Sequence, residues 1–390
     1  MDRTLRGAVA ITGVGTAGCG EAPGYSEIEL LGQAAQRAVA DAGLRMSDID
    51  GLCTANLSIA MWPLNVVEYL GIRPSFVEGT NIGGAAFVAH LLPAALALRA
   101  GICNRVLVCY GSNQRTGEPG RRERGIWRNR LDPAPFESPY APFNPPSSYA
   151  LMAARHMHQF GTTRRHLAEV AVAARNWARL NPEAFSRDPL TIDEVLSARM
   201  ISDPFTVHDC CLVTDGGGAF VLTRADEAAA GPQRPVYLLG HGVAAWHRTI
   251  SCMDDLTVTP SAESGPRAFA MAGLAPSDID VAQVYDAFSI NTILALEDLG
   301  FCAKGEGGPF VEDGAIGPGG RLAVNTNGGG LSCVQPNMYG TFAVIEAVRQ
   351  LRGGCGERQV EGAKVALVNG NGGNAAASQA TAIFGTAETL

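Results

Sequence analysis

The sequence predicts an α/β fold made of two similar halves, interrupted by one inserted loop and helical subdomain. Three observations support this prediction. The first is an internal repeat, and the second is that a turn, an apolar helix and a strand follow one another in the same order in both halves. The third is composition: of 390 residues, 46% are hydrophobic, 17% are charged and 47 are glycines. This chain is too apolar for disorder and too rich in glycine for a helical bundle. It is also long enough to bury a large core without disulfides or metals.

The internal repeat relates residues 37–50 to residues 267–280, which are identical at ten of fourteen positions. Each copy has the pattern of an amphipathic helix that ends at a glycine, Gly43 or Gly273, followed by a turn and a short strand. The helix-to-strand unit is therefore expected twice, once in each half.

A second pair of segments follows each copy of the repeat. Residues 83–112 contain a Gly-Gly turn, an apolar helix and a strand, and residues 328–376 contain the same three features in the same order. Helices that are apolar nearly all round are buried between layers. Strands such as VLVCY and VALVN fit a sheet that is covered on both faces.

The predicted division of the chain is 1–230 for the first half and 231–390 for the second, with strands expected to open them at 8–15 and 235–242. An insertion at about 113–207 has no counterpart in the second half. It contains a predicted helix with Thr162 or Thr163 as its N-cap and Pro182 as its stop signal. We expect this insertion to be a lid or an oligomerisation subdomain.

The net charge of -8 arises from dispersed acidic residues and argues against a nucleic-acid partner. One basic cluster interrupts this pattern, and it is predicted to be a solvated loop or a contact for a phosphate-rich or protein partner. It consists of Arg121, Arg122, Arg124, Arg128 and Arg130.

Cysteine usage predicts a reduced, cytoplasmic protein. The ten cysteines include no Cys-x-x-Cys pair, and the start of the chain lacks a signal peptide. No apolar run is long enough for a membrane span. The motif His208-Asp209-Cys210-Cys211 is not expected to bind zinc, because adjacent cysteines on an extended segment point to opposite faces.

Four motifs in this order resemble the thiolase superfamily, and specifically its sterol-carrier-protein-like branch. They are TDGGGAFVL at 214–222, YDAFS at 285–289, NTNGGGLSCVQPNMYG at 325–340 and NGNGGNAA at 369–376. The resemblance covers essentially the whole chain. It implies a duplicated thiolase fold with five layers, αβαβα, an acyl-CoA substrate and a homodimer.

The positions that carry thiolase chemistry have changed in this chain. Where the family opens its first buried helix with Cys-x-Ser-Gly, this chain has Asn81-Ile82-Gly83-Gly84, and no cysteine occurs anywhere in 54–102. Gln335 stands for the histidine of Gly-His-Pro, Leu367 for the second cysteine, and Tyr285 for the Asn or His of the third loop.

This departure resembles the thiolase-fold aldolases that shorten steroid or related acyl-CoA side chains, which also lack the cysteine. The resemblance implies retro-aldol cleavage of a bulky β-hydroxyacyl-CoA and a small OB-fold, zinc-ribbon partner in a heterocomplex. Zinc would belong to that partner, and this chain would bind no cofactor itself. Two alternatives stay open: a non-catalytic scaffold or a carrier of lipid or acyl-CoA, and a thiolase whose nucleophile has moved to Cys333.

Retro-aldol chemistry needs a base for the β-hydroxyl proton and donors for the enolate. Tyr285 or Tyr339, with a pKa lowered by its neighbours, is expected to act as base or proton donor, and Asp286 and Asn325 are expected to orient it. Asp286 by itself would raise the pKa of a nearby phenol.

The remaining candidates bind or position the substrate. Asn81 and Gln335 are expected to position the thioester, and the Gly-rich turns to offer backbone N–H groups to the oxyanion, through Gly329, Gly330 and Gly372. All but two of the 30 basic residues are arginines, so Lys304 is the one plausible Schiff-base lysine. The sequence does not separate steroid, aromatic and polyketide acyl groups.

Overall fold

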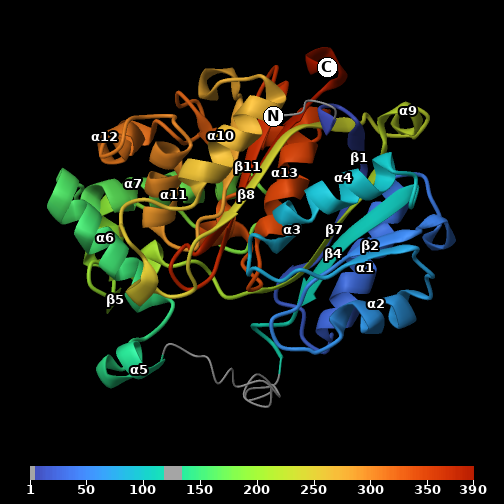
Figure 1. Ribbon diagram of the computed structural model, residues 1–390. Helices are drawn as coiled ribbons and strands as arrows, with labels where there is room; N and C mark the ends of the chain where they lie inside the picture. The colour runs from blue at the N-terminus through green and yellow to red at the C-terminus, as the bar shows by residue number, and fades with distance from the viewer. Residues whose placement is uncertain (1–4, 118–133) are drawn as a thin grey trace.

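The computed structural model describes residues 5–117 and 134–390 (Figure 1). The predicted basic cluster, Arg121 to Arg130, lies outside the described residues. The described strands of the main sheet are β1 (Val9–Gly20), β2 (Gly51–Cys53), β3 (Phe76–Glu78), β4 (Arg105–Ser112), β7 (Asp215–Arg224), β8 (Val236–Ala245), β9 (Val281–Val284), β10 (Ala323–Val324), β11 (Val365–Gly372) and β12 (Ser378–Gly385). A separate small sheet pairs β5 (Met200–Ser202) with β6 (Phe205–Thr206).

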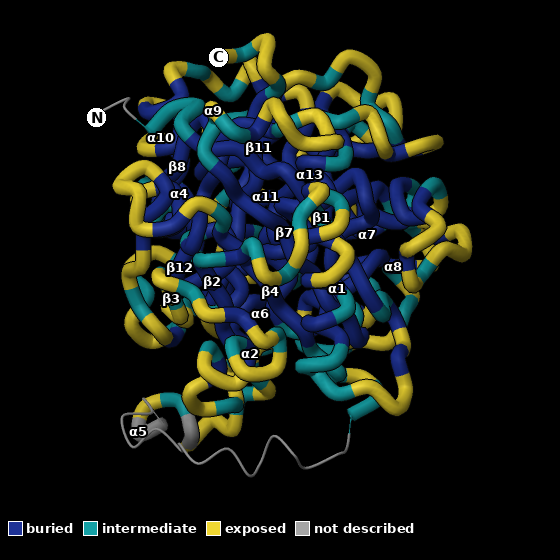
Figure 2. The backbone as a smooth tube through the Cα atoms, turned by 90° about the vertical axis from the view of Figure 1, so that its right-hand side faces the viewer, coloured by how far each residue is buried: buried dark blue, intermediate teal, exposed yellow. Residues whose placement is uncertain are grey.

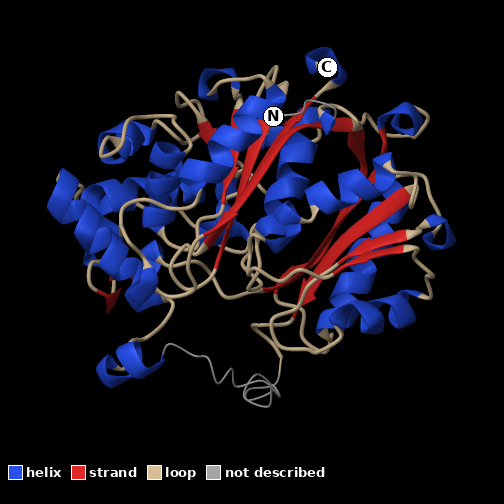
Figure 3. Cartoon of the chain, viewed as in Figure 1, coloured by secondary structure: helices blue, strands red, loops and turns tan. Residues whose placement is uncertain are grey.

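The strand order shows the predicted duplication directly. The sheet runs β10-β9-β11-β12-β8-β1-β7-β4-β2-β3, so the order outward from β8 repeats the order outward from β1. The two five-stranded groups join at a short antiparallel pairing of Ala10 with Tyr237 and Ile11 with Val236. Figure 3 shows the two groups of strands diverging from this junction.

Helices fill the space between the strand groups and cover their outer faces. The described helices are α1 (Glu27–Asp41), α2 (Trp62–Leu70), α3 (Ala86–Ala89), α4 (Leu91–Arg99), α5 (Ala134–Glu137), α6 (Pro146–Phe160), α7 (Arg164–Arg179), α8 (Ile192–Ser197), α9 (Ala225–Ala228), α10 (Ser261–Ala272), α11 (Ser289–Asp298), α12 (Gly307–Val311) and α13 (Gly340–Arg352). Among them, α13 packs against strands of both groups, and so does the α3–α4 pair. Helix α1 packs on β1, β7 and β4 from outside, and α10 packs on β8 and β12. The predicted five-layered αβαβα arrangement is confirmed.

The repeated helix-to-strand unit forms as expected in both halves. Gly43 and Gly273 follow α1 and α10 with φ angles of 71° and 67°, a backbone conformation that glycine adopts without a Cβ clash. A short 3₁₀ turn then leads into β2 or β9. In Figure 2 the buried residues concentrate around β11, α11 and α13, in the middle of the molecule.

The helices α6 and α7 of the insertion lie over the second half. Helix α7 begins after Thr163, whose hydroxyl accepts the His166 N–H at 3.3 Å, and it packs against α11 and the segment Gly329–Cys333. Figure 1 shows α6 and α7 beside α11 and α12. The role of this subdomain as a lid or oligomerisation element stays a prediction. The division at 230/231 falls between α9 and β8 and also stays a prediction.

Across residues 5–117 and 134–390, no helix has both the length and the apolar character that crossing a bilayer requires.

Candidate active site

Two of the predicted catalytic residues, Tyr285 and Tyr339, lie against each other in the core. Tyr285 follows β9 directly, and Tyr339 is the N-cap residue of α13. Their ring centroids are 5.5 Å apart and the rings are nearly perpendicular, at 86°. Tyr285 is 5% exposed and Tyr339 is 0% exposed. The fold therefore joins two loops that are more than fifty residues apart in the sequence.

The hydroxyl of Tyr285 has both a donor and an acceptor beside it. It donates to the Asn337 carbonyl at 3.0 Å and accepts from Gln335 Nε2 at 3.0 Å. The backbone N–H of Gln335 donates to Thr214 Oγ1 at 2.9 Å, which fixes the start of this side chain. Gln335, predicted from its place in the motif, thus contacts Tyr285 directly.

The hydroxyl of Tyr339 points to a residue that the sequence analysis missed. It donates to Asn327 Oδ1 at 2.9 Å, and the same oxygen accepts the Gly329 N–H at 2.8 Å. Asn181, from the segment after α7, holds the Asn327 carbonyl at 2.9 Å. The position of Asn327 inside the NTNGGG motif is the signal that identifies it in the sequence.

Burial raises the pKa of both tyrosines well above the ordinary value, so the expected lowering by neighbours is wrong. Loss of hydration outweighs the hydrogen bond from Gln335 to Tyr285 and the one between Tyr339 and Asn327. The Asp286 carboxylate raises the pKa of Tyr339 further, as its charge predicts. Both phenols are therefore protonated at neutral pH.

Asp286 and Asn325 organise the backbone around the tyrosines. The buried Asp286 carboxylate accepts N–H groups from Gly330 at 2.7 Å and Leu331 at 3.3 Å, and burial raises its pKa to about 7. Asn325 Oδ1 accepts the Val284 N–H at 2.8 Å, just before Tyr285. In the described part of the chain, both side chains hydrogen-bond to the backbone beside the tyrosines and neither hydrogen-bonds to a tyrosine hydroxyl.

The predicted glycines have different roles in the structure. A Cβ on Gly329 would lie 2.1 Å from Asp286 Oδ2, so this turn admits only glycine against the carboxylate. The amides of Gly329 and Gly330 already donate to Asn327 and Asp286. Gly372 ends β11, where a Cβ would lie 1.9 Å from the Ile82 carbonyl. The turn after Gly372 is thus the better remaining candidate for an oxyanion contact.

The loop before α3 reaches the tyrosines through Gly84 and not through Asn81. Asn81 is exposed, donates to the Asn56 carbonyl at 3.0 Å and accepts the Gly83 N–H at 3.1 Å. A Cβ on Gly84 would lie 2.3 Å from Tyr285 Cε2. Gly84 therefore allows Tyr285 to approach the loop, a contact that the motif comparison did not identify.

Lys304 is not placed in this cluster. Its ammonium pairs with Glu297 Oε2 at 3.0 Å and Asp298 Oδ1 at 2.6 Å, at the C-terminal end of α11. At a rise of 1.5 Å per residue, that end lies roughly 14 Å from the start of the helix that follows Tyr285. Lys304 thus holds two buried carboxylates.

Cys333 lies deep in the core beside Asn181, whose Nδ2 is 3.4 Å from its Sγ. Burial raises the pKa of its thiol well above the ordinary value, which disfavours a thiolate nucleophile. Cys211, by contrast, is partly exposed and interacts with the Gln335 side chain, although burial still raises its pKa to about 12. From its motif, Cys211 is expected only as a possible metal ligand, and no sequence pattern points to its contact with Gln335.

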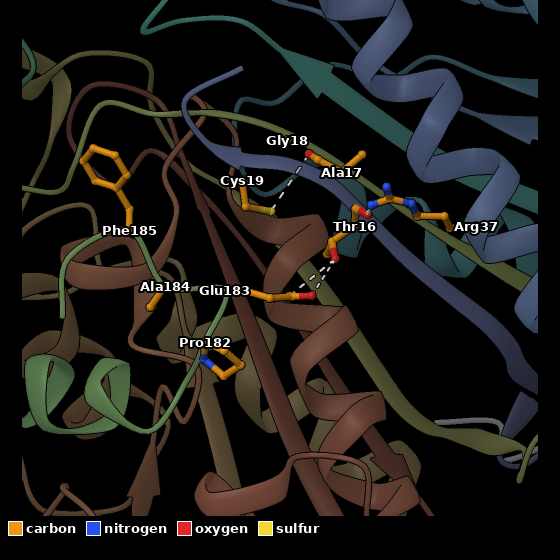
Figure 4. Close-up of a pocket in the computed structure, with 9 residues that line it drawn as sticks. All are labelled: Thr16, Ala17, Gly18, Cys19, Arg37, Pro182, Glu183, Ala184 and Phe185. Carbon is orange, nitrogen blue, oxygen red and sulfur yellow. Dashed lines mark hydrogen bonds between the residues drawn. The ribbon is translucent and has the colours of Figure 1, made fainter. Parts of the chain in front are cut away.

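A surface pocket of about 460 Å³ lies apart from the tyrosines, between the end of β1 and the segment after α7 (Figure 4). Thr16, Cys19, Arg37, Glu183 and Phe185 are among its lining residues, and none of the predicted site residues is. A much smaller adjoining cavity reaches Asn327 and Cys333. The candidate site is therefore placed at the tyrosine cluster and not at this pocket.

In the two described stretches of chain, no three His, Cys, Asp or Glu side chains are grouped to hold a metal ion.

Comparison with known proteins agrees with this architecture. The family model "Thiolase C-terminal domain-like" matches residues 242–386. A 17-hydroxy-3-oxo-4-pregnene-20-carboxyl-CoA lyase from Mycobacterium tuberculosis is 35% identical, over 90% of this chain and 92% of that protein. A steroid side-chain-cleaving aldolase from Thermomonospora curvata is 35% identical over 90% of this chain and 91% of the relative. An acetyl-CoA acetyltransferase from Methanothermobacter thermautotrophicus is 33% identical over 94% of this chain and 98% of the relative.

A solved structure, the Ltp2-ChsH2(DUF35) aldolase, superposes with a TM-score of 0.90 at 32% identity, covering 98% of this chain and 99% of that chain. Human mitochondrial 3-ketoacyl-CoA thiolase superposes with a TM-score of 0.72 at 14% identity, which shows the shared fold alone. With its duplicated layers, its motifs and these relatives, the chain belongs to the thiolase superfamily, in the sterol-carrier-protein-like branch that includes the steroid side-chain-cleaving aldolases.

Proposed function

We propose that this protein is a carbon–carbon lyase that cleaves a bulky β-hydroxyacyl-CoA by a retro-aldol reaction, giving a ketone or aldehyde and a shorter acyl-CoA. The observation that carries the proposal is the paired tyrosines, Tyr285 and Tyr339, at the centre of a thiolase fold whose nucleophile position is Asn81. Two of the relatives are named as a steroid side-chain-cleaving aldolase and a steroid acyl-CoA lyase, and these names support the same reaction class.

The reaction needs no covalent intermediate. The bond between the α and β carbons breaks, its electron pair moves into the thioester as an enolate, and the β-hydroxyl becomes a carbonyl as it loses its proton. The α carbon takes up a proton in the same step, as this negative charge develops. One proton leaves oxygen and one arrives at carbon, so the reaction balances without a cofactor, and we propose that this chain binds none.

A protonated tyrosine suits this exchange. A phenol hydroxyl is both a donor and an acceptor, so it can receive the β-hydroxyl proton while it gives its own proton to the α carbon. Tyr285 is the better placed of the two, because it contacts Gln335 and Gly84 and retains 5% exposure. Tyr339 packs edge-on against it and orients its ring.

Two other functions make different demands on the site. A thiolase needs a thiolate, yet Asn81 occupies the usual place and burial raises the pKa of Cys333 far above neutral. The 33% identity to an acetyltransferase reflects the shared fold and does not supply this nucleophile. A carrier would bind acyl-CoA without any need for hydrogen-bonded tyrosines.

We also propose a heterocomplex with a small OB-fold partner, which would carry any zinc, and a homodimer. The solved relative contains a DUF35 protein together with the aldolase chain, which supports the first. For the homodimer, β3 is an end strand of the main sheet and carries the exposed Val77, and the chain between β2 and β3 carries further exposed apolar residues: Leu57, Met61, Leu64 and Tyr69. Sedimentation of Val77→Lys against the unaltered chain tests the dimer, which this charge should weaken.

The test of the activity uses the 17-hydroxy steroid acyl-CoA named for the mycobacterial relative, with this chain alone and with a DUF35 partner. Cleavage to a ketosteroid and a shorter acyl-CoA, measured by liquid chromatography and mass spectrometry, supports the proposal. Binding of the acyl-CoA without turnover in both conditions would favour the carrier. Inactivation by loss of Cys333, as in Cys333→Ala, would favour the displaced thiolase.

A further inference from the structure

Tyr149, on α6 of the inserted subdomain, makes three hydrogen bonds to a single turn of the second half. Its hydroxyl accepts from Asn371 Nδ2 at 2.9 Å and from the Ala376 N–H at 3.0 Å. It donates to the Gly373 carbonyl at 3.2 Å. The Tyr149 side chain is only 1% exposed. We call residues 371–376 the anchored turn.

The anchored turn has a backbone conformation that needs support. Ala376 is fully buried and has a φ angle of 51°, in the left-handed region that disfavours residues with a Cβ. The Ala376 N–H is one of the two groups that donate to the Tyr149 hydroxyl. Tyr149 is itself held by stacking on Phe288, with ring centroids 4.7 Å apart. The inserted subdomain thus supplies a side chain, fixed by stacking, whose hydroxyl hydrogen-bonds to a strained turn.

The opposite side of the anchored turn faces the candidate active site. A Cβ on Gly84 would lie 2.6 Å from the Asn371 carbonyl and 2.3 Å from the Tyr285 ring, so these two groups meet at Gly84. A Cβ on Gly83 would lie 2.8 Å from the Gly373 nitrogen. The loop before α3 is thus packed closely against both the turn and the Tyr285 ring. A displacement of the turn therefore moves its amides relative to Tyr285, and small displacements of catalytic groups reduce rate strongly.

We propose that Tyr149 is a positioning residue for the reaction: it holds the anchored turn at the distance from Tyr285 at which the turn's backbone meets the thioester or enolate oxygen. The inserted subdomain is then a working part of the active site, since it sets the geometry of a loop that belongs to the other half of the duplication. This inference rests on the proposed lyase activity.

The test compares Tyr149→Phe with the unaltered chain on the same steroid acyl-CoA, with the DUF35 partner present if the activity requires it. Removal of the hydroxyl leaves the ring stacked on Phe288 and deletes the three hydrogen bonds. We expect kcat to fall by about tenfold or more while KM changes less than about threefold, because substrate binding elsewhere is unaltered. Tyr140→Phe is the matched control: Tyr140 lies in the same subdomain, is 85% exposed, and its loss should leave both constants unchanged.

A second substitution separates positioning from stability. Ala376→Gly removes the Cβ that makes a φ angle of 51° unfavourable. In the Tyr149→Phe background it should raise the melting temperature and leave kcat low, because the turn still lacks its anchor. Recovery of kcat together with stability would mean that Tyr149 only stabilises the fold, and the inference would be wrong.

The outcomes for this inference and for the proposed function are distinct. An unaltered chain without lyase activity overturns both. An active unaltered chain with a fully active Tyr149→Phe variant overturns only the positioning role. If Tyr149→Phe does not fold, Asn371→Ala takes its place and removes the hydrogen bond to Tyr149 together with the one that Asn371 Oδ1 accepts from Gln379 Nε2. Gln379→Leu, which removes only the second bond, is its control. A lower kcat in Asn371→Ala than in Gln379→Leu, with little change in KM, supports the inference, and equal kcat values refute it.

Discussion

The loops that precede the two central helices have equivalent places in the duplicated fold but very different surroundings. The loop before α3 contains Asn81, which is exposed and bonds only to its own neighbourhood through Asn56 and Gly83. The loop before α13 contains Asn327 and Gln335, both buried and both bonded to tyrosine hydroxyls. The duplication supplied two equal frameworks, and the polar groups of the candidate site gather in the second.

The strand ends beside these loops differ in the same way. By the spacing of the internal repeat, Asn56 corresponds to Asp286. Asn56 Oδ1 accepts N–H groups from Ser58 at 2.8 Å and Ile59 at 3.0 Å, within its own turn. Asp286 instead accepts N–H groups from a loop more than forty residues away. Asn56 thus stabilises a local turn in the first half, whereas the equivalent Asp286 holds a distant loop of the candidate site in the second.

The largest expected effect on kcat is that of Tyr285→Phe, which removes the hydroxyl at the centre of the candidate site in the second half. Loss of an acid–base group lowers kcat by about 100-fold or more, and the buried ring should keep the fold intact. Steady-state cleavage of the steroid acyl-CoA measures this. Tyr237→Phe on β8, at a tyrosine with 6% exposure, is the matched control and should change kcat less than about twofold. Full activity in the double variant Tyr285→Phe, Tyr339→Phe would show that catalysis needs neither hydroxyl. The second half would then not differ from the first in its catalytic groups.

A smaller effect, with a defined pH dependence, is expected at Asp286. Its pKa is raised to about 7 by burial, above the value of 3.8 for an ordinary aspartate. A raised pKa in the folded state means that stability is greatest below the unfolded pKa and is lost as pH rises through the folded one. The free energy of unfolding should therefore fall between pH 4 and pH 8, by at most about 4 kcal/mol from this group.

Urea denaturation of the unaltered chain and of Asp286→Asn checks this prediction across that pH range. The variant should lose the part of the slope that comes from Asp286. The corresponding change in the first half, Asn56→Ala, should leave the slope as it is, because Asn56 does not titrate. Equal slopes in the chain and in Asp286→Asn would show that the carboxyl ionises in the folded protein as easily as in the unfolded one.

The smallest effect is expected at Asn81, whose side chain is exposed and bonds to the Asn56 carbonyl and the Gly83 N–H, away from both tyrosines. Asn81→Ala should change kcat by less than about threefold. Gln335→Met, at the family's histidine position, is the contrasting variant and should lower kcat by about tenfold, because Tyr285 loses its hydrogen-bond donor. If Asn81→Ala were the more damaging of the two, the first loop would carry more of the chemistry than its surroundings indicate.

Much of the fold and part of the site can be predicted from sequence. Gly43 and Gly273 mark the repeated helix ends because a left-handed residue after a helix favours glycine, whatever surrounds it. The motifs identify Tyr285 and Gln335 because the resemblance matches them to positions where the family carries reactive groups, and they identify Tyr339 because it lies in one of the same loops. Tyr149 and Gly84 cannot be found in this way. Their importance comes from contacts across more than a hundred residues of sequence, which leave no local pattern.

The sequence by itself determined the duplicated α/β architecture, the family and the loss of the thiolase cysteine, since periodicity, glycine positions and residue identity are local properties. Only the tertiary structure decided the electrostatics of the candidate site. Burial, which depends on every layer at once, raises the pKa of Tyr285 and Tyr339 and brings that of Asp286 to about 7. It also placed Lys304 and Cys333 in structural contacts and brought Tyr149 from the insertion to the turn beside Tyr285.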